Sequence, residues 1–355
     1  MSPTFAELGG WPAALRPLLA GENLSAERAR AALAEVLGGS ATGAQLAAFL
    51  VALRMKGETV EEITGLVRAM LDAATPVELP STLDPIDTCG TGGAAMRRLA
   101  ACNVSTMAAF VVAGAGAAVC KHGNRAASST SGSADLLEAL GVSIDLGPEG
   151  VARCVAEVGF GFCFAPRFHP AMRHAGPTRR ELGVPTVFNV LGPLANPAGV
   201  RRQVVGVSDP ALADVVMGVL VARGAERAMV VHGHDGLDEL TTTTTSSVLE
   251  LRDGEVRSWV VDPADLGISR ADPTSIRGGG AQANVELVRR LVDGETGAHR
   301  DLVLLNAAAG LVVAGAVDDV ASGYEAAAVA VDEGGVAGVV DRLVTVSQDA
   351  ATRPA

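Results

Sequence analysis

Aromatic side chains are scarce in this sequence. Phe, Trp and Tyr make up only 3% of its 355 residues, although hydrophobic residues as a whole make up 48%. The interior must therefore be built from Ala, Val, Leu and Gly, with helices packed closely together. With 19% charged residues, the composition is typical of a globular chain and excludes a disordered one. The length is enough for about two domains.

Positive charge is also in short supply. The formal net charge is −12, and no basic run offsets it. This excess of acidic residues argues against a nucleic-acid-binding surface. An anionic substrate would then need local help from Lys, Arg or a divalent metal ion.

The five cysteines show no CxxC motif and no paired spacing, which favours reduced, buried thiols over disulfides or a zinc site. A basic-then-apolar leader is lacking at the N-terminus, so we expect a cytoplasmic protein. The longest apolar spans, 107–120 and 302–317, are shorter than a membrane helix, and Asn306 interrupts the second. Each is expected to be a helix buried on all sides.

Residues up to about 76 are expected to be helical. Thr42 with Gln45, and Thr59 with Glu62, have the spacing of capping boxes at helix starts. Apolar residues follow with helical periodicity, namely Leu46, Phe49, Leu50 and Leu53 in one segment and Ile63, Leu66, Val67, Met70 and Leu71 in the next. The prolines at 76 and 80 then end the pattern in a linker.

From residue 86 onward, short apolar runs alternate with helical segments, which favours a mostly parallel sheet with crossover helices. The candidate strands, besides the one that starts at Ile86, are Ala117–Cys120, Val142–Asp145, Phe160–Ala165, Gln203–Val207 and Met229–His232. Val248–Leu251 and Val256–Val261 flank an Asp-Gly pair at 253–254, which predicts a hairpin at the sheet edge. The expected fold class is α/β, with a small all-helical domain beside a larger domain built on this sheet.

The chain is organised around the stretch 87–135, which contains DTCGTGG, NVST and KHGNRAASSTSGSAD. Glycines after the first strand allow close backbone approach, and the Asn-x-Ser-Thr segment is a helix start whose free N–H groups suit an anion. The third segment supplies donors and hydroxyl groups. Two such loops at strand ends suit a ligand with several phosphates, although neither has the P-loop or the GxGxxG spacing.

These segments, followed by FAPRFHPAMRHAGPTRRELGVPTVFNVLGPLANP and GHDGLDELTT, make the chain similar to the anthranilate phosphoribosyltransferase family over about residues 25 to 345. The resemblance implies transfer of a phosphoribosyl group from phosphoribosyl pyrophosphate to the amine of anthranilate, the second step of tryptophan synthesis from chorismate. It also implies a helical domain at 1–76, completed by an excursion at about 167–185, and an α/β domain at 77–166 and 186–355. Substrates would bind in the cleft between the domains, and a homodimer would form through the helical domain.

The resemblance also assigns residues to the donor, phosphoribosyl pyrophosphate. The expected contacts are Gly90, Gly93, Ala94, Asn103, Val104, Ser105, Thr106, Lys121, His122, Gly123, Asn124, Arg125, Ala126, Ala127, Ser128, Ser129 and Ser133. Lys121 would neutralise charge that develops on the leaving pyrophosphate.

For the acceptor, the resemblance places Arg179 opposite the anthranilate carboxylate, and a planar guanidinium has the right geometry for that group. Its neighbour Arg180 would have less effect. The remaining expected acceptor contacts are Gly90, Asn124, His122, His169 and Pro193. Both histidines could instead be structural.

Asp238 and Glu239 follow an apolar strand that ends at His232. Adjacent carboxylates diverge on a helix or strand and are then ordinary surface acids, but in a loop at the end of a strand they can converge on Mg²⁺. The resemblance implies two Mg²⁺ ions held by Asp238 and Glu239, with the Ser105 hydroxyl on one of them. The amine of anthranilate is barely basic, so no dedicated acid or base is expected.

Two other functions stay open from the sequence. A pyrimidine nucleoside phosphorylase has the same fold and a related glycine loop, but it would use inorganic phosphate without an acidic metal pair. The other is a catalytically inactive dimeric binding or regulatory homologue. The feature that keeps it open is an altered glycine loop, in which Ala94 replaces the aspartate of the family's GTGGD and 94–101 forms part of a longer link. Arg97 and Arg98 lie in this link, and we expect one of them to contact the donor phosphates.

Overall fold

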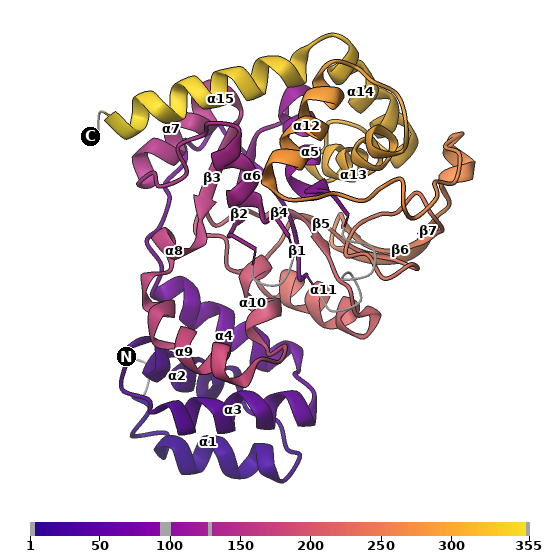
Figure 1. Ribbon diagram of the computed structural model, residues 1–355. Helices are drawn as coiled ribbons and strands as arrows, with labels where there is room; N and C mark the ends of the chain where they lie inside the picture. Colours follow the sequence, from indigo (N-terminus) through magenta and orange to yellow (C-terminus); the bar gives the residue numbers. More distant parts are fainter. Residues whose placement is uncertain (1–3, 93–100, 127–129, 353–355) are drawn as a thin grey trace.

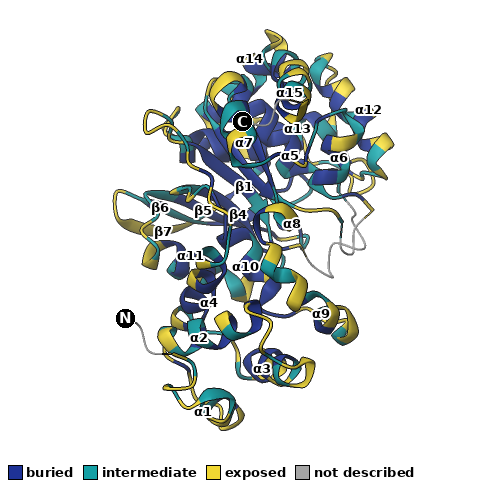
Figure 2. Ribbon diagram, turned by 90° about the vertical axis from the view of Figure 1, so that its left-hand side faces the viewer, coloured by how far each residue is buried: buried dark blue, intermediate teal, exposed yellow. Residues whose placement is uncertain are grey.

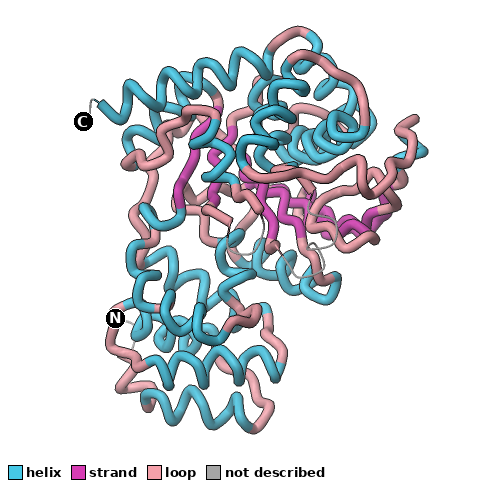
Figure 3. The backbone as a smooth tube through the Cα atoms, viewed as in Figure 1, coloured by secondary structure: helices cyan, strands magenta, loops and turns pink. Residues whose placement is uncertain are grey.

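The computed structural model describes residues 4–92, 101–126 and 130–352, which fold into two lobes (Figure 1). One lobe is purely helical and contains the N-terminus, and the other contains every strand of the described chain (Figure 3). The helices are α1 (Gly10–Leu19), α2 (Ala26–Leu37), α3 (Gly43–Lys56), α4 (Val60–Asp72), α5 (Val104–Gly114), α6 (Ser133–Ala139), α7 (Pro148–Val158), α8 (Ala165–Phe168), α9 (Gly176–Leu182), α10 (Phe188–Leu194), α11 (Ala213–Ala222), α12 (Ala281–Val292), α13 (Ala298–Ala314), α14 (Val320–Asp332) and α15 (Gly335–Thr352), with short 3-10 turns at Pro170–His174, Pro210–Leu212 and Pro263–Leu266.

Two helices of the helical lobe, α3 and α4, begin where the sequence predicts. The Thr42 and Thr59 hydroxyls each accept a hydrogen bond from the backbone N–H three residues later. The side chains of Gln45 and Glu62 in turn accept from the backbone N–H groups of Thr42 and Thr59, so both predicted capping boxes are confirmed. The predicted apolar stripe of α3 is buried, from Leu46 to Leu53. The excursion returns to this lobe, because α9 packs on α3 and the turn at Pro170–His174 packs on α2.

The strands form one seven-stranded sheet in the order β3-β2-β1-β4-β5-β6-β7. Their bounds are β1 (Ile86–Gly90), β2 (Val119–Gly123), β3 (Phe160–Phe164), β4 (Arg202–Gly206), β5 (Arg227–Gly233), β6 (Ser246–Arg252) and β7 (Glu255–Val261). The first five in this order pair in parallel, and β5, β6 and β7 pair in antiparallel fashion. Asp253 and Gly254 join β6 to β7 with positive φ angles of 54° and 79°, as the predicted Asp-Gly hairpin requires.

Helices cover both faces of the sheet. α5, α13, α14 and α15 lie on one face, where the largest buried cluster includes almost every residue of α13. α10 and α11 lie on the other face, and the second cluster continues through them into α2, α3 and α4. The strands near the middle of the sheet are therefore buried on both sides, whereas much of β7 is exposed at the edge (Figure 2).

One strand prediction is wrong. Residues 142–145 form a loop between α6 and α7, although Val142 and Ile144 are buried. The backbone N–H of Ser143 donates to the Ser347 hydroxyl of α15 at 3.0 Å. The alternating burial that imitates a strand arises because this loop packs on a helix, so its backbone has no neighbouring strand to pair with.

All five cysteines are unpaired thiols, and four of them are buried. Cys120 and Cys163, on β2 and β3, are neighbours, with Sγ atoms 3.7 Å apart. None of the helices in the described part of the chain combines the length and hydrophobicity needed to cross a lipid bilayer.

Candidate active site

Several of the predicted site residues lie near the carboxyl ends of the parallel strands. The strand order reverses between β1 and β4, and a crevice outside this point is where open parallel sheets bind ligands. The loop that follows β5 carries Asp238 to the ends of β1 and β4. There the Asp238 Oδ2 atom accepts a hydrogen bond of 2.8 Å from the backbone N–H of Gly92.

Asp238 is buried and Glu239 is half-buried, and neither forms an ion pair within the described ranges of the chain. Within the residues that the structure describes, the buried oxygens Asp238 Oδ1 and Glu239 Oε2 have no hydrogen-bond partner. Burial raises the pKa of both carboxyls, and the neighbouring Asp238 raises the pKa of Glu239 further. Orphaned, buried carboxylate oxygens of this kind fit a bound divalent cation.

Other His, Cys, Asp and Glu side chains do not complete a cage around the pair: across the described segments, no group of three or more such residues is placed to hold a metal. This agrees with Mg²⁺, which uses one or two carboxylates and takes its other oxygens from phosphate and water.

Two glycines make room for this loop, and the sequence pattern indicates only one of them. A Cβ atom on Gly90 would lie 2.2 Å from Asp238 Oδ2, and one on Gly206 would lie 1.5 Å from the Asp238 carbonyl oxygen. Gly206 ends β4, and no motif marks it. Its role becomes visible only when the β5–β6 loop is folded across the strand end.

Lys121 in β2 and Ser105 in the first turn of α5 lie together beside β1. Lys121 is 2% exposed, and its Nζ atom donates to the carbonyl of Thr88 and, at 3.2 Å, to the Ser105 hydroxyl. Burial lowers the pKa of Lys121, while the negative charge of Asp87 opposes that shift. The structure thus fixes the Lys121 ammonium group beside the helix start of α5.

Asp87 is a second residue without a predicted role. It is fully buried in β1, where it accepts hydrogen bonds from the Asn196 side chain at 2.8 Å and the His122 backbone N–H at 3.2 Å. Burial raises the pKa of Asp87 to about 6, against the opposing charge of Lys121. A charged residue inside a buried parallel strand is the signal that could have marked it.

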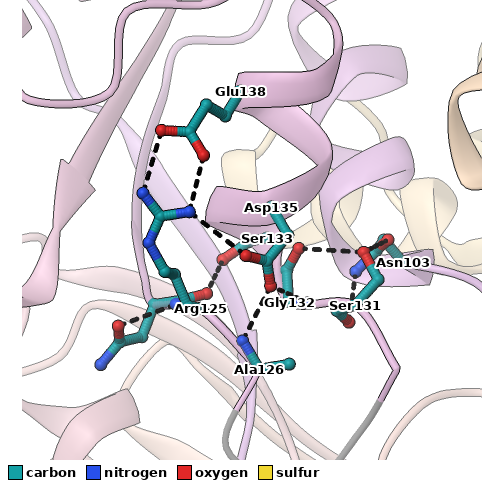
Figure 4. Close-up of polar contacts among 9 residues, drawn as sticks. Asn103, Arg125, Ala126, Ser131, Gly132, Ser133, Asp135 and Glu138 are labelled. Atoms are coloured by element: carbon teal, nitrogen blue, oxygen red, sulfur yellow. Dashed lines mark hydrogen bonds and ion pairs between the residues drawn. The ribbon is translucent and has the colours of Figure 1, made fainter. Parts of the chain in front are cut away.

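Asn103 precedes α5 as expected, but its side chain does not cap the helix. Its carboxamide instead donates to the carbonyl of Ser131 at 3.1 Å (Figure 4) and accepts from the Asn284 side chain at 2.6 Å. In the first turn of α5, the backbone N–H groups of Val104 and Thr106 donate to the carbonyls of Cys102 and Asn103, at 2.6 and 3.0 Å, so an anion there would be attracted mainly by the positive end of the helix dipole. Nearby, the Ser133 hydroxyl donates to the carbonyl of Asn124 at 3.2 Å.

Arg125 faces acidic side chains of the same loop and helix. Its guanidinium forms bonds of 2.6 and 2.9 Å to Glu138 and one of 3.3 Å to Asp135 (Figure 4), and it lies over the ring of Phe164. A contact between Arg125 and the donor would require these pairs to exchange partners. The donor role of Arg125 stays a prediction.

The expected acceptor residues fall into two groups. His122 and His169 come together with ring centroids 5.0 Å apart, and a ring nitrogen of each contacts a carbonyl of the α10 region, that of Gly192 at 3.0 Å and that of Ala195 at 2.9 Å. Burial lowers the pKa of His122 to about 3, so its ring is neutral, and the buried Nε2 atom lacks a partner among the described residues. Pro193 lies in the same segment, where its carbonyl accepts from Gln203 at 3.1 Å.

Arg179 forms the second group, on α9 in the helical lobe. Its guanidinium stacks on the ring of Phe188, with 4.9 Å between the Cζ atom and the ring centroid. Over the described ranges, it has no hydrogen bond or ion pair, while its neighbour Arg180 is exposed. Arg179 is thus held in place with its donors free.

Several predicted residues lie outside the described part of the chain. They are Gly93, Ala94, Ala127, Ser128 and Ser129 among the donor contacts, together with Arg97 and Arg98. These assignments stay predictions.

The fold and this site define a two-domain glycosyl transferase. The pattern described as "Glycosyl transferase family, helical bundle domain" matches residues 12–74, and the one described as "Glycosyl transferase family, a/b domain" matches residues 83–337. The chain belongs to this family, among the anthranilate phosphoribosyltransferases, which act in tryptophan biosynthesis.

Full-length relatives support this assignment. The chain is 54% identical to the anthranilate phosphoribosyltransferase of Nocardioides sp., over 94% of this chain and 98% of that protein, and 51% identical to that of Salinispora arenicola, over 97% and 98%. The crystal structure of the Thermus thermophilus enzyme superposes with a TM-score of 0.88 at 41% identity, over 94% and 99% of the two chains. The Saccharomyces cerevisiae enzyme in complex with PRPP and Mg gives a TM-score of 0.87 at 27% identity, over 96% and 98%.

Proposed function

We propose that phosphoribosyl pyrophosphate binds at the carboxyl ends of β1, β2 and β5, and that anthranilate reaches it from the side of α9 and α10. The observation that carries this proposal is the acidic pair on the β5–β6 loop, whose buried oxygens Asp238 Oδ1 and Glu239 Oε2 have no hydrogen-bond partner among the described residues, while Asp238 Oδ2 binds the start of the glycine loop. A solvated surface pair would have no such oxygens. The nucleoside phosphorylase alternative needs no acidic metal pair and leaves these carboxylates unexplained.

Asp238, Glu239 and the Ser105 hydroxyl would hold Mg²⁺, which we propose is present as two ions per subunit. When bound with the donor, Mg²⁺ would offset the negative charge of the pyrophosphate. The chemistry of the donor set fits, since all three residues offer hard oxygen ligands. Removal of the ion should leave the two carboxylates exposed to each other's charge.

The protein's own residues contribute to the reaction by binding and orienting the substrates. The C1–O bond to pyrophosphate breaks while the C1–N bond to the anthranilate amine forms, so negative charge grows on the leaving pyrophosphate. Lys121 is held rigidly by Thr88 and Ser105, so its ammonium group can stabilise that charge without reorganising. The positive end of the α5 helix dipole would act in the same direction. Alignment of the amine by the two domains would supply much of the remaining rate enhancement.

A fluorescence assay tests the proposed function. Anthranilate fluorescence should fall only when phosphoribosyl pyrophosphate and Mg²⁺ are both present, should stay constant in EDTA, and should fall again once Mg²⁺ is restored. Turnover in metal-free enzyme would contradict the metal assignment. Phosphorolysis of a pyrimidine nucleoside would favour the alternative enzyme, and no turnover of any kind would favour an inactive homologue.

We expect Arg179→Ala to lower kcat/KM for anthranilate by about 10- to 150-fold, because a hydrogen bond to a charged group contributes roughly 1.5–3 kcal/mol. Steady-state kinetics with anthranilate varied give this value directly. Arg180→Ala is the matched control, since Arg180 adjoins Arg179 on α9 and is exposed. Equal, small effects from both variants would place the anthranilate carboxylate elsewhere.

We further propose a cytoplasmic homodimer that forms through the helical domain. Leu19 on α1 is 78% exposed and Met55 on α3 is 84% exposed, and Val51 on α3 is also exposed. Large apolar side chains in this position would be covered by a second copy of the helical lobe. Five unpaired thiols fit a reducing compartment.

A further inference from the structure

α13 carries a polar residue that packing of the helix does not require. From Leu302 to Val313 its residues are Leu, Val, Ala and Gly, except for Asn306, and the whole run is buried. Asn306 itself is 6% exposed. An apolar side chain of similar volume would avoid the cost of burying a carboxamide, so the contacts of Asn306 need an explanation.

The Asn306 carboxamide holds one residue of the acidic loop by both of its backbone groups. Asn306 Oδ1 accepts from the backbone N–H of Leu240 at 2.9 Å, and Asn306 Nδ2 donates to the Leu240 carbonyl at 2.8 Å. Nδ2 also donates to the Leu302 carbonyl at 2.9 Å, one turn earlier on α13, which orients the amide. Leu240 is fully buried, so water cannot replace these partners.

Two hydrogen bonds to one residue fix its rotation as well as its position. Leu240 directly follows Glu239, so rotation of the Leu240 peptide would swing the Glu239 side chain. The next residues are held differently: the Thr241 N–H donates to the Ser246 hydroxyl at 2.9 Å, the Thr241 hydroxyl donates to Asp235 at 2.6 Å, and the Thr242 carbonyl accepts from the Ala271 N–H at 3.0 Å. Asn306 therefore attaches the loop to the core helix on the Glu239 side, opposite the contacts of Asp238 with Gly92 and Gly206.

We propose that Asn306 is a positioning residue for the metal-binding carboxylates: its two hydrogen bonds to Leu240 orient Glu239 toward the site that Asp238 faces. This inference rests on the proposed metal-binding role of the pair. Asn306 does not touch the substrates. It acts by holding the acidic loop in the orientation in which both carboxylates can share a cation and the donor's phosphates.

The test is Mn²⁺ binding in the presence of phosphoribosyl pyrophosphate, followed by the electron paramagnetic resonance of free Mn²⁺. Asn306→Leu keeps the volume and removes both bonds to Leu240, and we expect its Mn²⁺ dissociation constant to rise at least about tenfold. Ser347→Ala is the matched control, because Ser347 is fully buried on α15 and its hydroxyl also accepts from a loop N–H, that of Ser143. The control should bind Mn²⁺ within about twofold of the wild type.

A kinetic readout separates positioning from stability. Asn306→Leu should raise the KM for phosphoribosyl pyrophosphate and change that for anthranilate little, whereas a merely destabilised enzyme would lose active protein and keep both KM values. Should Asn306→Leu fail to fold, Asn306→Ser is measured by the same criteria, because its shorter side chain cannot span both Leu240 groups. Mn²⁺ binding and a donor KM as in the wild type would overturn the inference.

The Asp238→Asn variant distinguishes a failure of the positioning role from a failure of the proposed metal site. Weak Mn²⁺ binding by Asp238→Asn together with normal binding by the Asn306 variants would overturn only the positioning role. Normal binding by Asp238→Asn would overturn the proposed metal site, and the positioning role with it.

Discussion

Asp238→Asn and Glu239→Gln, made separately, are expected to lower kcat/KM by about a thousandfold, or about 4 kcal/mol of transition-state stabilisation. Each change replaces a charged oxygen ligand with a neutral carboxamide of the same shape. The measurement is steady-state turnover at fixed Mg²⁺ with phosphoribosyl pyrophosphate varied. The loss should lessen as Mg²⁺ is raised, since a weakened site can still be filled by mass action.

The same two variants should not be less stable in EDTA than the wild type. Burial raises the pKa of both carboxyls above their unfolded values, so in metal-free protein the folded state binds more protons and stability falls as pH rises through that range. Neutral side chains remove this penalty at neutral pH. Thermal unfolding in EDTA compares the stability of the two variants with that of the wild type. A marked drop in melting temperature would show that the pair supports the fold instead of a ligand.

Gly206→Ala is expected to lower kcat/KM by about a hundredfold, although Gly206 touches neither carboxylate oxygen. Its added Cβ would lie 1.5 Å from the Asp238 carbonyl oxygen and 2.4 Å from the Asp238 carbonyl carbon, so the loop backbone itself must move. A displacement of about 1 Å in a positioned group can cost 10²-fold in rate. Steady-state kinetics and circular dichroism together should show a folded protein with a large kinetic defect.

Gly338→Ala is the control for this change. Gly338 lies within α15, and an added Cβ there meets nothing within 4 Å. The same substitution should leave kinetics unchanged and slightly stabilise the helix, because Ala favours helices over Gly by about 1 kcal/mol. Unchanged kinetics in Gly206→Ala as well would mean that the acidic loop tolerates displacement and that its position is not critical.

The parts of the fold that could be predicted from the sequence are those set by nearby residues. Thr42 and Gln45 are three positions apart, and Asp253-Gly254 is a turn in itself, so each pattern contains the interaction that it predicts. The segment 142–145 shows the limit. Its alternating burial depends on α15, some 200 residues later in the chain. Periodicity reports that a segment is half-buried but not what buries it.

The residues around the candidate site also fall into those that the sequence predicts and those that only the fold reveals. The resemblance predicts roles for Asp238, Glu239 and Lys121, because their motifs are continuous stretches of sequence. Asn306 and Gly206 were missed, because each acts on the acidic loop through a contact that only the fold creates. Asn306 lies 66 residues from Leu240, and its one visible signal was a polar residue in an apolar run. An amide at such a position has a partner elsewhere in the chain, but the sequence does not say which.

The most direct test of this account is anomalous X-ray diffraction from crystals grown with Mn²⁺ and phosphoribosyl pyrophosphate. We expect Mn²⁺ peaks within ligand distance of Asp238 and Glu239, with the pyrophosphate between the acidic loop and the start of α5. Manganese bound only to the donor or to surface carboxylates, with Asp238 Oδ1 and Glu239 Oε2 still unpartnered, would contradict it.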